Sequence, residues 1–135
     1  MIVILSVSRQ EAARELLNRR KARNNLIDFT RYTMPGFEAA EHHKQICGAL
    51  EKVSKGEINR LMIFAPPRHT KSELASRRFP AWYLGQHPDK QIISTTYGHD
   101  FAADFGQLGV EILCAGGAPV SGRHANLLFV RPRVR

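Results

Sequence analysis

The 135-residue sequence is poor in cysteine and contains no long apolar run. Two cysteines, Cys47 and Cys114, are too few for the disulfide framework of a small secreted domain, which favours a reducing compartment. No apolar run approaches the roughly 20 residues that cross a membrane. Residues 1–7 are largely apolar, but no basic residue precedes them, so they lack the form of a signal peptide. These absences predict a cytoplasmic protein without a membrane span.

Acidic residues are also scarce, because 12 Asp and Glu stand against 20 Lys and Arg and give a net charge of +8. No acidic residue follows Glu111, and the last 22 residues carry +4 of the excess through Arg123, Arg131, Arg133 and Arg135. A basic balance favours contact with polyanions through charge attraction and counterion release. Since half of the excess lies in this tail, the total overstates the case for nucleic-acid binding by the rest of the chain.

Helix signals dominate the first half of the chain. A capping box formed by Ser8 and Glu11 predicts a helix that ends at Met-Pro-Gly in positions 34–36. The apolar positions of this helix are Ala12, Leu16, Leu17, Leu26 and Ile27. Apolar residues at spacings of three and four predict a second helix over 38–54, and we expect Gly56 to end it. The very basic stretch 18–23 is interpreted as a solvated helix face.

The second half alternates apolar runs with helical segments. The continuous apolar run 61–64 predicts a strand buried on both faces of a parallel sheet, and 91–96 predicts another. Helices are expected over 71–85 and 100–113, with a short strand at 127–130. Strand, helix and strand in this order imply a right-handed βαβ unit. We therefore predict an α/β fold, a parallel sheet with a crossover helix, preceded by a helical N-terminal extension.

The most informative segment is 64–72, Phe-Ala-Pro-Pro-Arg-His-Thr-Lys-Ser, between the first predicted strand and the next helix. That is the context of a phosphate-binding P-loop, where a helix N-terminus offers N–H groups and a positive dipole end. Lys71 would reach the β- and γ-phosphates, and the Ser72 hydroxyl would bind Mg²⁺. The pattern is imperfect, because Ala65 and Thr70 stand where glycines belong. The alternative is an ordinary strand-to-helix turn with an exposed lysine.

The segment 66–72 resembles the Walker A loop of tailed-phage terminase large subunits. Neighbouring segments resemble the same family in the same order: 28–33, 41–46, 73–85 and 92–100. The resemblance covers roughly residues 10–107. It divides the chain into a helical N-terminal extension (1–58), an incomplete P-loop NTPase core (59–113) and a basic tail that matches nothing in the family (114–135).

The resemblance implies ATP hydrolysis that drives DNA into a procapsid, with ATP and Mg²⁺ as cofactors, in the cytoplasm of a bacterial host. It implies phosphate and Mg²⁺ binding by Lys71 and Ser72, and a catalytic role for Arg68 at the γ-phosphate. The forked, permanently charged guanidinium of Arg68 suits that role. The remaining residues of the nucleotide-binding loop are Pro67, His69 and Thr70. The implied partners are phage DNA, a small terminase subunit, the portal ring and further copies of the chain in the motor.

Two histidines upstream of the loop also enter the prediction. His42 and His43 lie where the family contacts the adenine, and His43 is included as a nucleotide-binding residue. A plain helix-face position is the alternative for both.

Two departures from the family pattern change the expected activity. Thr70 replaces a glycine that admits positive φ; a β-branched residue there costs of order 1–3 kcal/mol, which would weaken nucleotide binding about ten- to a hundredfold. The acidic strand motif that holds Mg²⁺ and orients water has no counterpart, since Asp100, Asp104 and Glu111 lie on a predicted helix. The family's nuclease has no counterpart either. We therefore expect a truncated chain without ATP turnover of its own, and a shifted reading frame would explain its arginine-rich end.

Two other interpretations stay open. A basic DNA-binding protein without catalytic activity is supported by the stretch 18–23 and by the tail, although no docking motif is recognisable. A zinc site would use His43, Cys47, Cys114 and His124, whose spacing is loose. Mg·ATP should stabilise a nucleotide binder, whereas a DNA binder should respond to duplex DNA and lose that response in salt.

Overall fold

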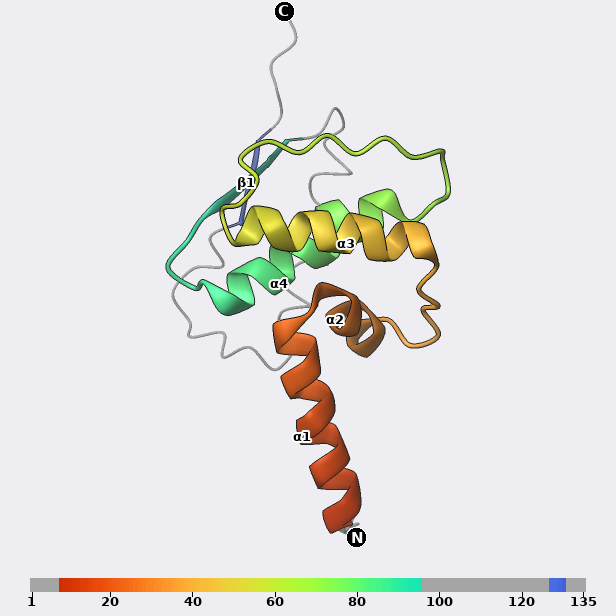
Figure 1. Ribbon diagram of the computed structural model, residues 1–135. Coiled ribbons are helices and arrows are strands. Elements are labelled where there is room, and N and C mark those ends of the chain that lie inside the picture. The colour runs from red at the N-terminus through yellow and green to blue at the C-terminus, as the bar shows by residue number, and fades with distance from the viewer. Residues whose placement is uncertain (1–7, 96–126, 131–135) are drawn as a thin grey trace, which may run out of the picture.

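The computed structural model describes residues 8–95 and 127–130, and these residues are mostly helical (Figure 1). The elements, in order, are α1 (Arg9–Asn24), α2 (Leu26–Thr33), α3 (Glu41–Ser54), the π-helical turn η1 (Glu73–Arg78), α4 (Phe79–Gln86), β1 (Ile92–Thr95) and β2 (Leu127–Val130). Lys71 and Ser72 are already helical, and η1 runs directly into α4, so residues 71–86 form one continuous helix. The helix predicted over 71–85 is confirmed.

The first predicted helix is in fact two helices, α1 and α2, separated at Asn25. The capping box that begins α1 is confirmed: the Ser8 N–H donates to Glu11 Oε2 at 2.9 Å, and the Glu11 N–H donates to Ser8 Oγ at 3.2 Å. Asn25 has extended backbone, and its side-chain oxygen accepts from the N–H groups of Ile27 at 2.9 Å and Asp28 at 3.3 Å. Asn25 ends one helix and caps the next, so the helix is interrupted without a proline or glycine. The spacing of apolar residues alone therefore did not predict this break.

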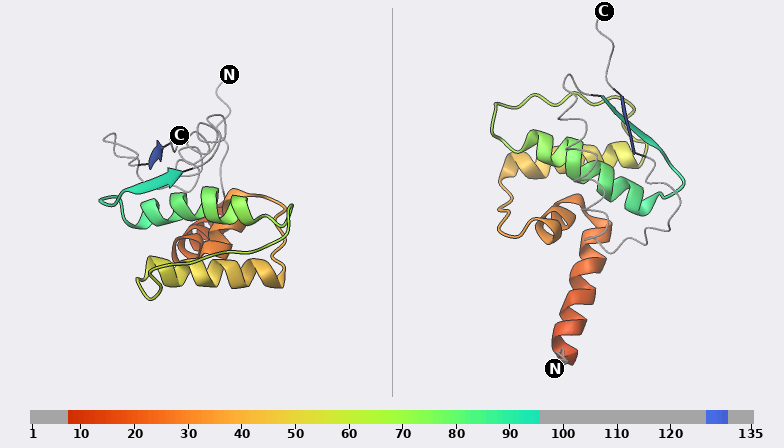
Figure 2. Two further views of the ribbon diagram at one scale, coloured as in Figure 1. Left: turned by 90° about the horizontal axis from the view of Figure 1, so that it is seen from above. Right: turned by 180° about the vertical axis from the view of Figure 1, so that it is seen from behind.

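The N-terminal part of α1 extends away from the other helices (Figures 1 and 2). Its predicted apolar positions Leu16 and Leu17 are 66% and 57% exposed, and Ala22 is its one buried residue. These two leucines therefore contribute nothing to the core, whereas Leu26 on α2 is fully buried. None of the helices in the described part of the chain is long and apolar enough to cross a membrane.

The end of α3 agrees with the prediction. The helix stops at Ser54, and Gly56 follows with φ of 76°, a backbone state that favours glycine. The Gly56 N–H donates to Val53 O at 3.0 Å and so satisfies one of the last carbonyls of the helix.

The predicted parallel sheet with a crossover helix is wrong. Residues 61–64 form no strand and instead run as an extended segment back along α3 (Figure 1). β1 pairs in parallel with β2, with Ile92 opposite Leu127. Strands occur at Ile92–Thr95 and Leu127–Val130, as expected from 91–96 and 127–130, but Ile93 is 66% exposed, so the first strand is not buried on both faces as predicted. The predicted strand–helix–strand unit needed 61–64 as its first strand, so the P-loop fold is not supported. The helix predicted over 100–113 lies outside the described residues.

The physical reason lies in how the run 61–64 is covered. Leu61 and Ile63 pack against the helical core, whereas Met62 and Phe64 are 76% and 85% exposed. A strand of a parallel sheet needs cover on both faces, and this segment has cover on one. A short apolar run does not reveal from its sequence how many of its faces will be covered.

One hydrophobic core joins the helices. Its buried members are Ala22, Leu26, Phe29, Cys47, Leu50, Leu74, Ala81 and Trp82. α3 and the helix 71–86 lie side by side, and α2 packs against both (Figure 2). Each fully buried large apolar side chain contributes about 1.5–3 kcal/mol relative to exposure. The core takes residues from both sides of the boundary predicted between residues 58 and 59, so the first three helices and the helix 71–86 stabilise one another.

Side chains of α4 bond the carbonyl end of α1. Trp82 Nε1 donates to Ala22 O at 3.2 Å, and Gln86 Nε2 donates to Arg23 O at 2.8 Å. The last carbonyls of a helix have no partner within it. These two bonds supply partners and thereby connect the end of α1 to α4.

Both ends of α2 are bonded by neighbouring helices. Glu51 Oε1 on α3 accepts from the Leu26 N–H at 2.8 Å. The buried Arg78 donates from Nη1 to Thr33 O at 3.1 Å, and its Nη2 lies 2.8 Å from a carboxylate oxygen of Glu73. Arg78 therefore connects the helix 71–86 to the end of α2 through a buried charge-assisted contact.

Replacing Arg78 with alanine should lower the free energy of unfolding by about 3 kcal/mol or more, because it leaves a carbonyl and part of a buried carboxylate without a partner. Arg31→Ala is the matched control, since its ion pair with Asp28 is exposed to 51% and 36% and should contribute less than about 1 kcal/mol. Urea unfolding of both variants measures the difference. Equal losses for the two would contradict a structural role for Arg78.

Candidate phosphate-binding site

The turn before the helix 71–86 has an unusual backbone. Arg68 has φ of 65° and Thr70 has φ of 54°, and His69 between them is not among the residues with positive φ. Lys71 then continues into the helix. Left-handed backbone is uncommon outside glycine, and for a β-branched residue such as Thr70 it is a true outlier. Such strain costs of order 1–3 kcal/mol and persists where the surrounding structure enforces it.

The helix that follows begins at this turn. The Leu74 N–H donates to Thr70 O at 3.0 Å, which makes Thr70 the residue before the first helical turn. The N–H groups of the first turn have no partner within a helix, and the N-terminal end carries a partial positive charge. A left-handed residue followed by a right-handed one, as Thr70 is followed by the helical Lys71, orients successive N–H groups toward one anion. The turn and the helix start together therefore suit an anionic ligand.

His43 on α3 holds the turn in place. Its Nδ1 lies 3.1 Å from the Ala40 N–H, which can only donate, so Nδ1 accepts and the proton of the neutral ring is on Nε2. Nε2 lies 2.9 Å from Thr70 Oγ1 and therefore donates to that hydroxyl. One ring thus connects the start of α3 with the strained residue of the turn.

The ionisation of His43 follows from its surroundings. The side chain is buried among α3, Phe37 and the turn. Burial lowers the pKa of His43 below its ordinary value of 6.5, and the neighbouring charges of His42 and His69 act in the same direction. The main chain of Glu38 opposes the shift. The ring is therefore neutral at pH 7, which preserves both of its hydrogen bonds.

Three imidazole rings gather at the turn. The ring centroids of His42 and His43 are 3.9 Å apart, and those of His42 and His69 are 5.5 Å apart. His69 Nδ1 donates to Pro67 O at 3.0 Å, which fixes the proton of its neutral ring on Nδ1. In the part of the chain that the structure describes, no group of three His, Cys, Asp or Glu side chains could hold a metal ion.

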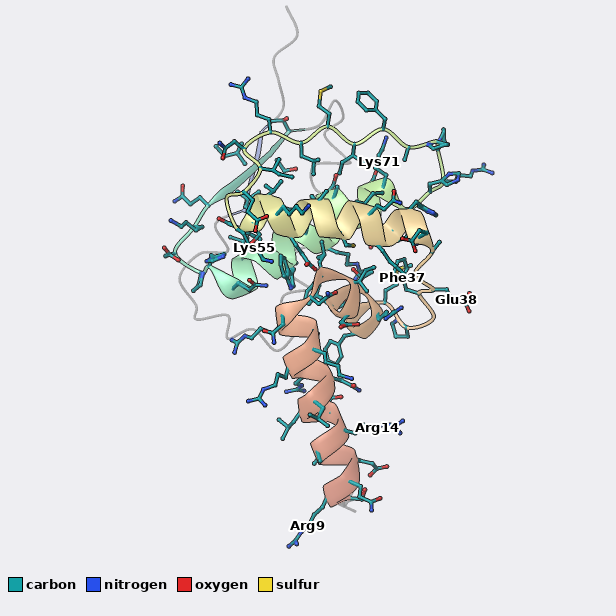
Figure 3. The ribbon with its side chains drawn as sticks, in the orientation of Figure 1. Arg9, Arg14, Phe37, Glu38, Lys55 and Lys71 are labelled. Atoms are coloured by element: carbon teal, nitrogen blue, oxygen red, sulfur yellow. The ribbon has the colours of Figure 1, made fainter. Side chains whose placement is uncertain are left out.

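The cationic residues of the turn differ in exposure. Arg68 is exposed, whereas Lys71 is partly covered at the start of the helix. Figure 3 shows Lys71 near the N-terminal half of α3 and Lys55 at the opposite end of that helix. The exposed Ser72 follows Lys71 in the first helical turn. Arg68, Lys71 and Ser72 lie within five consecutive residues that span the turn and the start of the helix.

The nearest carboxylate in sequence is already engaged. Glu73 Oε2 accepts from Arg77 Nη1 at 2.8 Å, and its Oε1 accepts from Arg78 Nε at 2.9 Å. Both oxygens of Glu73 therefore bind guanidinium groups. This leaves the positive charges of Arg68 and Lys71 without compensation from Glu73.

The structure thus brings His43, His69 and Thr70 into one cluster and places Pro67 against His69. The nearness of Arg68, Lys71 and Ser72 to this cluster follows only from their positions next to these residues in the sequence. The sequence did not indicate that Phe37 would pack on His43, with centroids 5.1 Å apart. The sequence offers little to predict this contact, because Phe37 is a single aromatic residue after Pro35-Gly36 and belongs to no periodic pattern.

The zinc interpretation loses one of its ligands. Cys47 is 2% exposed in the hydrophobic core, and burial raises the pKa of its thiol to about 12. A thiol must be deprotonated to bind zinc, so Cys47 is unsuited to that role. Cys114 and His124 lie outside the described residues.

Comparison with known proteins gives no relative. No protein-family model matches the chain, and neither the curated proteins nor the solved structures include a significant match.

The neutral His43 predicts a pH dependence of stability. Because its folded pKa is below 6.5, the unfolded chain takes up the proton first as the pH falls, so the stability present above 6.5 should decline below it. His43→Gln should remove this part of the decline, whereas His87→Gln, directly after the end of α4, should leave it. Urea unfolding at a series of pH values tests this, and superimposable curves for the parent and His43→Gln would contradict it.

Proposed function

We propose that the turn 66–72 binds the phosphate chain of a nucleotide. The observation that carries this proposal is the left-handed backbone at Arg68 and Thr70 directly before the helix that begins at Lys71. Strained backbone in non-glycine residues is concentrated at ligand sites, and alternating backbone of this kind is typical of phosphate sites. The partial positive charge at the N-terminus of the helix also favours a bound phosphate.

Three residues of the turn contact the ligand in this proposal. Lys71 neutralises phosphate oxygens as a point charge, and Arg68 binds them through two parallel N–H donors. The Ser72 hydroxyl binds Mg²⁺ that arrives with the nucleotide. ATP with Mg²⁺ is the proposed ligand, because its triphosphate carries several negative charges for Arg68 and Lys71 to neutralise.

His43 acts through Thr70 in this proposal and does not touch the phosphates. Its Nδ1 accepts from the Ala40 N–H, and its Nε2 donates to the Thr70 hydroxyl at 2.9 Å, so neither ring nitrogen is available to a phosphate. The bond keeps Thr70 in its left-handed state and thereby keeps the following N–H groups aligned. His43 is therefore a positioning residue, and the adenine contact suggested by sequence similarity is not needed for it.

In this proposal the chain binds Mg·ATP but does not hydrolyse it. Phosphoryl transfer depends on a carboxylate that holds Mg²⁺ and a group that orients water. Glu73, the carboxylate next to the site in sequence, is bonded to Arg77 and Arg78. Its oxygens would have to leave two guanidinium groups to serve a metal.

We further propose, from the segments quoted in the sequence analysis, that the chain is related to terminase large subunits of tailed phages. In this proposal the chain works in the cytoplasm of a bacterial host cell. Phage DNA, a small terminase subunit, the portal ring and further copies of the chain are the proposed partners. The proposal concerns lineage and ligand, and it does not include the parallel sheet that the structure contradicts.

A second candidate function is contact between α1 and DNA. The observation that favours it is the projecting position of this basic helix (Figure 1). Its cations are Arg9, Arg14, Arg19, Arg20, Lys21 and Arg23. Of its two carboxylates, Glu11 belongs to the capping box and Glu15 bonds Arg19 and Tyr32, so the positive charge predominates. Such binding would weaken steeply with salt, whereas binding at the turn would require Lys71.

Lys71→Ala should weaken binding of a fluorescent ATP analogue with Mg²⁺ by about tenfold to a hundredfold, because a charge-assisted hydrogen bond contributes roughly 1.5–3 kcal/mol. Lys55→Ala removes the same charge at the far end of α3 and should leave the affinity nearly unchanged (Figure 3). Equal weakening in both variants would indicate attraction by net charge and would refute the turn as the site.

Thr70→Gly should bind nucleotide about tenfold more tightly than Thr70→Ala, because glycine adopts positive φ without strain and lets phosphate approach the backbone. Both variants lack the hydroxyl that bonds His43, so they differ only in the Cβ atom and in the strain of positive φ that alanine keeps. Titration calorimetry with Mg·ATP compares the two. If both variants bind equally well, the left-handed backbone at position 70 does not limit affinity.

A further inference from the structure

The extended segment between α3 and the turn presents an unpaired backbone. Within the described residues, positions 58–66 take part in no backbone–backbone hydrogen bond. Exposure alternates with a period of two from Arg60 to Ala65, as in a strand with one covered face. Unpaired N–H and C=O groups along such an edge are available to another strand.

The solvent-exposed face of the segment 60–64 consists of two large apolar side chains and one charged side chain. Met62 and Phe64 are 76% and 85% exposed, and Arg60 is exposed on the same face. Leu61 and Ile63 on the other face pack against the helical core, which holds the segment in place. An ordered edge with two exposed large apolar side chains favours strand addition.

We propose that the segment 60–64 pairs with the same segment of a second copy of this chain, antiparallel, about a two-fold axis at Met62. A two-fold axis brings one surface patch against itself, so the patch must be complementary to itself. In this register Arg60 of each copy lies opposite Phe64 of the other, and Met62 lies opposite its equivalent. A guanidinium over an aromatic ring is an attractive contact, and the methionine sulfur is diagonal to the same ring.

Charge selects this arrangement over the parallel one. In a parallel in-register pair the two Arg60 side chains would stand side by side, about 4.8 Å apart along the hydrogen-bonding direction, and repel each other. In the antiparallel register they are separated by four residues along the strands, about 14 Å. Arg60 is the single charged residue of the segment, so its placement decides the pairing.

This surface is distinct from the phosphate site, and its test is independent of nucleotide binding. Sedimentation velocity of the full chain at increasing concentration, without nucleotide, should show a monomer–dimer equilibrium. Phe64→Lys should weaken dimerisation by about tenfold or more, because two-fold symmetry places two cations opposite Arg60 residues. Leu16→Lys, at a comparably exposed leucine on α1, should leave it unchanged. A parent chain that stays monomeric, or equal effects of both variants, would overturn the proposal.

A double variant tests the register. Arg60→Glu combined with Phe64→Lys places each introduced lysine opposite an introduced glutamate of the second copy only if the strands are antiparallel about Met62. Dimerisation should then recover at least partly relative to Phe64→Lys alone. No recovery would overturn the antiparallel pairing. Binding of a strand from another protein in place of the second copy would appear as a monomeric parent chain, and would equally overturn it.

Discussion

The hydrogen bond between His43 and Thr70 is the constraint on which the proposed site depends. It joins residues 27 positions apart, at 2.9 Å, and holds a β-branched residue at φ of 54°. The ring accepts from the Ala40 N–H at Nδ1 only while it is neutral, and that tautomer carries its proton on Nε2, which donates to Thr70. Burial keeps it neutral. This contact connects the first turn of α3 to the residue that directly precedes the helix 71–86.

The helical core supplies the rigidity that such strain requires. Arg78 and Glu51 bond the two ends of α2, and Trp82 bonds the end of α1, so the helices are connected at their termini as well as through apolar packing. α3 thus has two tasks, because one of its faces carries Cys47 and Leu50 into the core and its first turn carries His43 to the site. Loss of helix packing would therefore release the turn.

The sequence predicted local features better than tertiary ones. The capping box at Ser8 and the stop at Gly56 depend on neighbouring residues, and both are confirmed. The run 61–64 was assigned to a parallel sheet because its apolar character does not show how many faces are covered. The contact of His43 with Thr70 crosses two segments and has no sequence signal of its own, although the glycine-type position of residue 70 was visible in the loop pattern. The fold class therefore needed the structure, while the candidate residues of the turn did not.

In the proposed site, the N–H groups at the start of the helix 71–86 bind phosphate. The most direct measurement follows the backbone amide signals of isotope-labelled protein by NMR while Mg·ATP is added. We expect the largest shifts at His69, Thr70, Lys71 and Ser72, and we expect them to saturate with a single affinity. Shifts confined to the basic residues of α1, with no saturation and with loss in moderate salt, would show that the chain attracts nucleotide only as a polyanion and would contradict the account.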